Sequence, residues 1–211
     1  MMILSGIMLF YGLMFYPAYV KTDNVSALFL FALLITGVFI FNYGTFLFAW
    51  QSSHFDIIIS SKISLKEYIK SKFTLFIIVS FLQFLLASFY GFLSWKILPI
   101  QLAAFLFNIG VNSFITIYAA TYNYKYVNIS KSSAMNYQGL GAVQWLQSLL
   151  ISLAPMGIFF LLNKFFGFSA AIITICLMGT CGLVFHKTLI NRLVNQFNNR
   201  KYKIMEGFRE R

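Results

Sequence analysis

Apolar residues fill most of the chain, and charged residues divide it into long uncharged segments. There are six of these segments, each with at least 20 residues: 1–20, 24–55, 73–95, 97–124, 132–163 and 165–186. A helix needs about 20 mostly apolar residues to cross a hydrocarbon layer of about 30 Å. The pattern therefore predicts an integral membrane protein that crosses the bilayer six times.

The apolar segments predict helices rather than strands. Backbone inside a bilayer must satisfy its own hydrogen bonds, so only helices and closed barrels span it. Barrel strands alternate apolar and polar residues, whereas the stretch ALFLFALLITGVFIF at 27–41 is apolar almost throughout. We expect an all-α helical bundle over residues 1–186, with spans near 3–20, 25–50, 73–95, 99–121, 141–163 and 166–186.

The basic residues predict the orientation of this bundle. The chain has 16 Lys and Arg against 5 Asp and Glu, which gives a net charge of +11. Six spans place 13 basic residues on one side, in the loops 51–72 and 122–140 and the tail 187–211, and 3 on the other. The excess predicts cytoplasmic N- and C-termini in the cell's inner (plasma) membrane. These short basic segments also indicate contact with anionic membrane lipids rather than with nucleic acid.

The chain begins directly with the apolar string MMILSGIMLF, without a basic cytoplasmic arm before the first span. We therefore expect it to be a fragment of a longer membrane protein.

No pattern in the sequence predicts catalysis by the chain itself. All five acidic residues lie outside the predicted spans: Asp23, Asp56, Glu67, Glu206 and Glu210. No ionisable group is therefore expected at membrane depth, where ion-coupled carriers usually need one. No Gly-Lys pair could end a phosphate-binding loop, and the two histidines lack metal-binding spacing. We expect a protein that is not an enzyme and that holds no metal or cofactor.

Three polar residues form a stripe within the fourth span. Asn108, Asn112 and Thr116 are spaced by four and so share one helix face. One interpretation is hydrogen bonding between packed helices. The other is that the stripe lines the path of a substrate.

The loop between the second and third spans carries a helix-start signal. Ser64 followed by Glu67 is typical of a capping box, in which each side chain binds a free backbone amide at the helix start. This predicts a helix that begins near Leu65 and continues into the third span.

A short amphipathic element precedes that helix. Phe55, Ile58 and Ile59 provide apolar bulk, while Asp56 and Ser60 are polar. The element would either anchor to lipid headgroups or dock onto a cytoplasmic partner.

A second amphipathic helix is predicted after the last span. Leu189, Ile190, Leu193, Val194 and Phe197 recur at three- and four-residue spacing. We expect this helix to rest on headgroups or on the partner.

The loop string FDIIISSKISLKEYIKSK at 55–72 resembles the first cytoplasmic loop of ABC transporter permeases of the type-2 exporter class. The resemblance lies in Asp56, Ile58, Ile59, Ser64, Glu67 and Lys72, while Gln51 departs from the glutamate that the family often has. In that family the element is a coupling helix seated in a cleft of the ATPase subunit. The resemblance implies that a separate cytoplasmic ATPase contacts Phe55, Asp56, Ile58, Ile59, Ser64, Glu67 and Tyr68.

Further strings resemble the later half of a subgroup of longer permeases. These strings are LFYGLMFYP (9–17), FLFNIGVNSF (105–114), NYQGLGAVQ (136–144) and KYKIMEGFRER (201–211). The resemblance implies a membrane-spanning subunit of an ATP-driven exporter that pairs with a second permease half or with its own copy. The alternative is a membrane scaffold or assembly protein without transport activity.

Overall fold

The structure is a computed structural model that describes residues 2–61, 63–127 and 142–209. In this part of the chain 88% of the structure is helical and there are no strands, which confirms the all-α prediction. The second half of the predicted 122–140 loop and most of the string NYQGLGAVQ lie outside the described residues. The helices are α1 Met2–Lys21, α2 Val25–Thr45, η1 Ala49–His54, α3 Phe55–Ser60, α4 Leu65–Ala87, η2 Ser88–Phe92, α5 Ile97–Phe107, η3 Asn108–Asn112, α6 Ser113–Ala120, α7 Ala142–Phe166, α8 Phe168–Val184 and α9 His186–Arg209.

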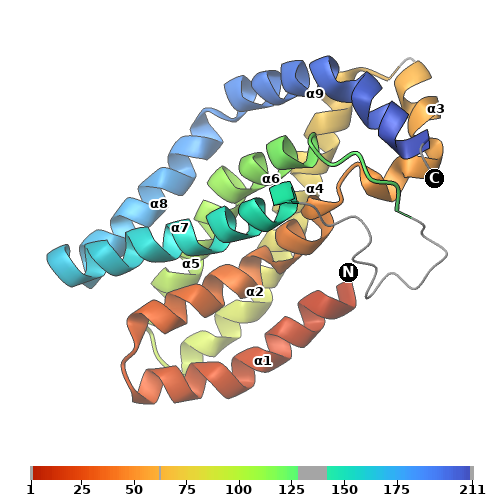
Figure 1. The fold of residues 1–211 in the computed structure, drawn as a ribbon. Helices are drawn as coiled ribbons and strands as arrows, with labels where there is room; N and C mark the ends of the chain where they lie inside the picture. Colours follow the sequence, from red (N-terminus) through yellow and green to blue (C-terminus); the bar gives the residue numbers. More distant parts are fainter. Residues whose placement is uncertain (1, 62, 128–141, 210–211) are drawn as a thin grey trace.

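Two helical segments form the centre of the bundle, and the others surround them (Figure 1). The α5–η3–α6 segment is 78% buried and α2 is 56% buried, whereas α4 with η2 is 28% buried and α7 is 22% buried. The peripheral helices carry exposed leucines and phenylalanines such as Leu85, Leu153 and Phe160. An apolar outer surface of this kind is typical of helices that face lipid.

Four helices of the described chain are long and apolar enough to cross a membrane. They span Val25–Thr45, Leu65–Phe92, Ile97–Ala120 and Trp145–Phe166. A fifth is obtained if α8 and α9, which meet at a bend of 65°, are counted as one broken span. The six predicted spans are therefore only partly confirmed.

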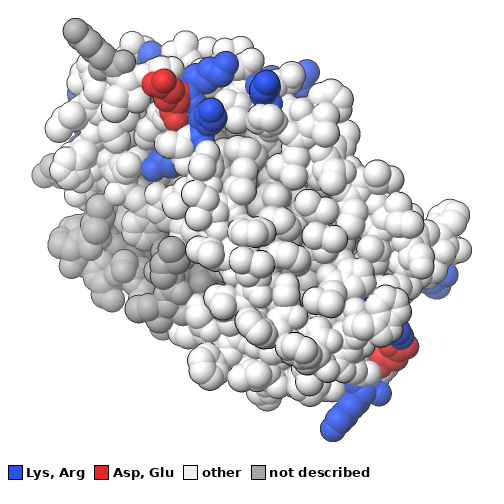
Figure 2. All heavy atoms as spheres, turned by 180° about the vertical axis from the view of Figure 1, so that it is seen from behind, with Lys and Arg blue, Asp and Glu red and all other residues white. Residues whose placement is uncertain are grey.

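The charged side chains gather at the two ends of the molecule. Figure 2 shows Lys, Arg and acidic side chains at opposite ends, with a broad uncharged band between them. This separation matches an apolar layer with a polar boundary on either side.

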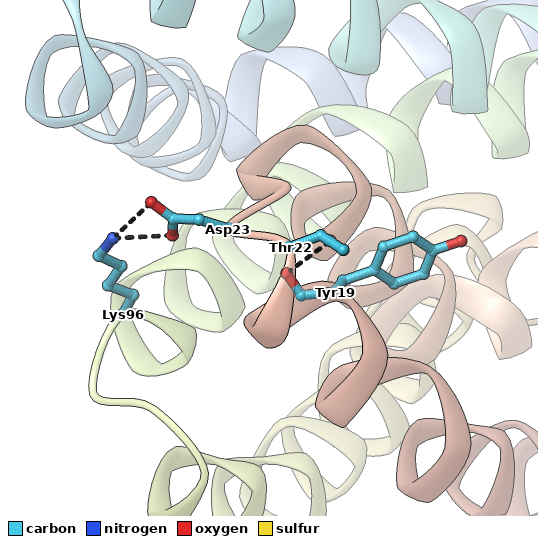
Figure 3. Close-up of polar contacts among 4 residues, drawn as sticks. All are labelled: Tyr19, Thr22, Asp23 and Lys96. Carbon is cyan, nitrogen blue, oxygen red and sulfur yellow. Dashed lines mark hydrogen bonds and ion pairs between the residues drawn. The ribbon is translucent and has the colours of Figure 1, made fainter.

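At one end an ion pair joins two turns of the bundle. Asp23, in the turn between α1 and α2, lies 2.8 Å from the Lys96 ammonium, which directly precedes α5 (Figure 3). The same turn has Asp23 at φ 47°, and the Thr22 hydroxyl donates to the Tyr19 carbonyl. Both charged side chains are exposed, so the pair contributes about 1 kcal/mol at most.

The predicted amphipathic tail helix is present as α9, but its apolar face packs against the chain itself. Ile190, Leu193 and Phe197 are buried against η1, α3, α4 and α6. The expectation that this face rests on headgroups or on a partner was wrong. Burying the face inside the fold removes its apolar side chains from water without any other molecule.

Candidate functional site

The polar stripe of the fourth span fits into two glycine positions of α2. A Cβ at Gly37 would lie 2.6 Å from Asn108 Nδ2, and a Cβ at Gly44 would overlap Thr116 Cγ2. The two glycines are seven residues apart and Asn108 and Thr116 are eight apart, so the contacts repeat every two helical turns. The missing side chains on α2 therefore make room for the polar side chains of η3 and α6.

Asn108 ties η3 to α2 through its side-chain amide. Its Nδ2 donates to the Leu33 carbonyl and to Thr36 Oγ1, both at 2.9 Å, and its Oδ1 accepts from Asn112 Nδ2 at 2.7 Å. Asn112 also donates to the Ile151 carbonyl of α7 at 3.3 Å. These contacts support the helix-packing interpretation, because they link three helices within an apolar bundle.

The stripe lies on a local change of helix type. Residues Asn108–Asn112 form a π-helical turn between α5 and α6. Such single turns insert an extra residue into a helix and are frequent at functional sites. Here the turn directs both asparagine side chains into the buried space between α2 and α7.

Three buried polar atoms on these helices have no hydrogen-bond partner among the residues that the structure describes. They are Asn112 Oδ1, Thr116 Oγ1 and Gln147 Oε1, each on a side chain that is at most 3% exposed. Gln147 also lines a hollow of about 180 Å³ between α2 and α7, together with Thr45 and Ser152. Buried polar atoms normally find partners. Of the three, Gln147 is the residue that lines the hollow, so its Oε1 is the atom that could accept a hydrogen bond from a small polar group there.

The short amphipathic element predicted before the third span is present as α3, but its apolar face points into the molecule. Phe55 is 1% exposed, and its ring packs against Phe197 at 6.1 Å and Phe208 at 5.1 Å. Ile58 and Ile59 are half-buried against the same cluster. Phe55 is therefore not available as an anchor for an external partner, because α9 already covers it.

The outward face of this element carries different residues. Ile57 is 65% exposed, and Ile63, just before α4, is 55% exposed. Asp56 is also exposed and accepts two hydrogen bonds from the Arg209 guanidinium. Ile57 and Ile63 are therefore large apolar side chains that α3 and the segment before α4 leave exposed.

The third-span helix begins at Leu65, as predicted, but the capping box does not form. Ser64 is the N-cap in an extended conformation, and its side chain makes no capping hydrogen bond. Glu67 is exposed in the first turn. A carboxylate there still interacts favourably with the positive end of the helix dipole.

Tyr68 faces inward from that helix. Its hydroxyl donates to Gln51 Oε1 at 2.6 Å, and its ring lies 5.3 Å from the Lys72 ammonium. Gln51, the position that departs from the permease pattern, is thus part of an internal contact. Tyr68 is 8% exposed and lies inside this cluster rather than on the outer surface.

Aromatic side chains after α6 hold the middle of α9. The Arg200 guanidinium stacks 3.6 Å from the centre of the Tyr122 ring and donates to the Tyr124 hydroxyl. A hydrogen bond from Tyr118, together with the charge of Arg200, lowers the pKa of the Tyr122 phenol. These contacts fix α9 across the end of the bundle and place it over α3.

Two features of the site were not predicted from the sequence. Thr36 stands alone in an apolar run, and only the packed structure brings it to Asn108. Gln147 lies near other polar residues in the first half of α7, and only the packed structure places it in the hollow beside α2. Within the described residues, no group of three or more His, Cys, Asp or Glu side chains could hold a metal ion.

Comparison with curated proteins and with solved structures finds no match for this chain. One family model matches it, over residues 1–211. The chain belongs to the family of unknown function DUF5687.

Proposed function

We propose that this chain is the membrane-spanning permease subunit of an ATP-driven exporter. The subunit would cross the inner membrane six times with both termini in the cytoplasm, and ATP hydrolysis would take place in a separate subunit. Four to five apolar helices and the uncharged band between two charged ends support the membrane part of this proposal.

The observation that carries the proposal is the position of α3. This six-residue helix lies between η1 and the start of α4, with Phe55 anchored inward and Ile57 turned outward. Because α4 runs without interruption from Leu65 into the bundle, a force on α3 would reach the bundle through a rigid helix. Rigid-body movement of packed helices is a known way to transmit such a force.

The hollow between α2 and α7 would form part of the substrate path. It is polar on one side, through Gln147 and Ser152, and lies beside the glycine contacts of α2. A substrate group with hydrogen-bond donors would satisfy the unpartnered Gln147 Oε1.

Co-purification from the native membrane tests the docking surface. A tagged chain should retain an ATPase with a phosphate-binding loop, identified by mass spectrometry. The double variant Ile57→Ala with Ile63→Ala should lower its recovery at least tenfold, since truncating anchors at an interface typically costs more than 1 kcal/mol each. The control is Ile78→Ala with Ile173→Ala, two isoleucines that are 53% and 57% exposed but lie within the apolar band.

The same experiment separates transport from the scaffold alternative. Equal recovery of the ATPase with both double variants would contradict docking through Ile57 and Ile63. Recovery of other membrane proteins, without any ATPase, would favour the scaffold. Phe55 is unsuitable for this test, because its removal would disturb the fold that positions α3.

A further inference from the structure

A long groove runs along the inner side of the α8–α9 bend. Its larger part is a hollow of about 830 Å³ lined by Val111 of η3 and by residues of α8 and α9. A second hollow of about 440 Å³ continues between α6 and α9, and both are lined by Leu189 and Arg192. We call these two hollows the bend groove. Arg192 stands where they meet.

The bend groove is mostly apolar, with a charged position where its two hollows meet. Leu177 and Met178 of α8 line its wall together with Phe185 at the bend, whereas Thr188 and Arg192 line the α9 part. Leu177 and Phe185 are 62% and 57% exposed, so this wall is open to whatever surrounds the helix. In the membrane, those surroundings are lipid chains.

Arg192 has no internal partner that would account for its charge. Among the described residues, no hydrogen bond, ion pair or ring contact involves its guanidinium, unlike Arg200 and Arg209, which both have partners. In the part of the chain that the structure describes, no acidic side chain lines either hollow. An anion is therefore the ligand that the groove fits by charge at Arg192.

We propose that the bend groove binds one phospholipid with an anionic headgroup. The phosphate would lie against Arg192 and Thr188, and an acyl chain would lie along the α8 wall. Basic side chains at the ends of membrane helices attract anionic headgroups, and the hollow has the volume of an ordinary ligand pocket.

A second copy of the chain fits this groove less well. A dimer axis along the membrane normal would bring two copies of Arg192 together at the same depth. The groove supplies no carboxylate to separate these like charges. The charge pattern thus favours a lipid.

Native mass spectrometry of the purified protein tests the proposal. The protein in mild detergent is titrated with phosphatidylglycerol and with phosphatidylcholine that has the same acyl chains. The wild type should bind phosphatidylglycerol at least fivefold more tightly. Arg192→Gln should lower that affinity about fivefold and leave phosphatidylcholine binding unchanged, as expected for the loss of one headgroup charge contact.

Two further variants keep the test specific. Lys187→Gln is the matched control, because Lys187 is an exposed cation on α9 that lines neither hollow; it should leave both affinities unchanged. Leu177→Trp should fill the groove beside α8 and weaken the binding of both lipids.

Equal effects of Arg192→Gln and Lys187→Gln would overturn the proposal. So would lipid binding that does not depend on the headgroup. A dimer in the wild type that Leu177→Trp abolishes, without any lipid preference, would show that a second copy occupies the groove instead.

Discussion

The Arg209 guanidinium lies 2.8 Å from the Asp56 carboxylate and joins the last turn of α9 to the first turn of α3. The two residues are 153 positions apart in the sequence. Both side chains are at least half exposed, so their ion pair is worth about 1 kcal/mol at most. Phe55, buried beside it against Phe208, contributes more through apolar burial.

The first prediction compares Phe55 with its neighbour Asp56. Phe55→Ala should destabilise the contact between α3 and α9 by about 3 kcal/mol, because it leaves a cavity between aromatic rings. Asp56→Asn should cost less than about 1 kcal/mol. Hydrogen exchange of peptides covering 55–60 and 197–209 measures both effects. Equal protection in the two variants would show that the aromatic contact does not hold α9.

The second prediction concerns the crossing of α8 with the π-helical turn. A Cβ at Gly182 would overlap the Gly110 carbonyl, and a Cβ at Gly110 would overlap the Gly179 carbonyl. Gly182→Ala should therefore push the backbone of α8 away from that of η3. The melting temperature of the protein in detergent should fall. Gly157→Ala on α7 is the control, because no atom lies within 4 Å of the added Cβ. That variant should be neutral or slightly stabilising, since alanine favours helix more than glycine.

Equal melting temperatures for the two alanine variants would contradict the close approach of α8 to the π-helical turn. The comparison is sharp because both changes add one methyl group to a helix of the same bundle.

The third prediction separates the helix-packing role of Asn108 from the proposed substrate-binding role of Gln147. Asn108→Leu should destabilise the protein by about 1–2 kcal/mol, because the Leu33 and Thr36 contacts are lost. Gln147→Leu should leave the free energy of unfolding unchanged or raise it, because Gln147 Oε1 is buried without a partner. Unfolding in denaturing detergent measures both values. A large loss of stability with Gln147→Leu would mean that this side chain belongs to the packing.

The sequence pattern predicted the helices well, because uncharged runs and helix ends are local features. Leu65 follows Ser64 as the helix start although the serine makes no capping bond, and the periodic apolar residues of α9 are the buried ones. The π-helical turn at Asn108–Asn112 was not predicted, because it depends on contacts with α2 and α8.

What the amphipathic faces bind could not be predicted from the pattern. The periodicity around Phe55 and Phe197 shows that each helix has an apolar face, but lipid, a partner protein and another part of the chain satisfy such a face equally well. The structure resolves this by packing the two faces together. Ile57 and Ile63 stay exposed outside this contact, so they replace Phe55 as the residues proposed to dock a partner.

The last prediction tests the orientation of the bundle, which rests on the split of 13 basic residues against 3. Single cysteines would replace Lys66, Lys203 and Lys164 in a background without Cys176 and Cys181. All three lysines are exposed, so burial within the fold will not block the reagent.

Positions 66 and 203 should react with a membrane-impermeant thiol reagent only after the cells are opened, whereas position 164 should react in intact cells. Lys164 lies in the last turn of α7, and the α7–α8 end of the bundle lies opposite to α3 and α9 (Figure 1). A label at position 164 and the labels at positions 66 and 203 therefore report on opposite faces of the membrane. Labelling of position 66 from outside would show that the orientation is the reverse of the predicted one. The helix α3 would then lie beyond the reach of a cytoplasmic ATPase. That result would remove the basis of the proposed function, while the bend groove and its lipid preference could still be tested separately.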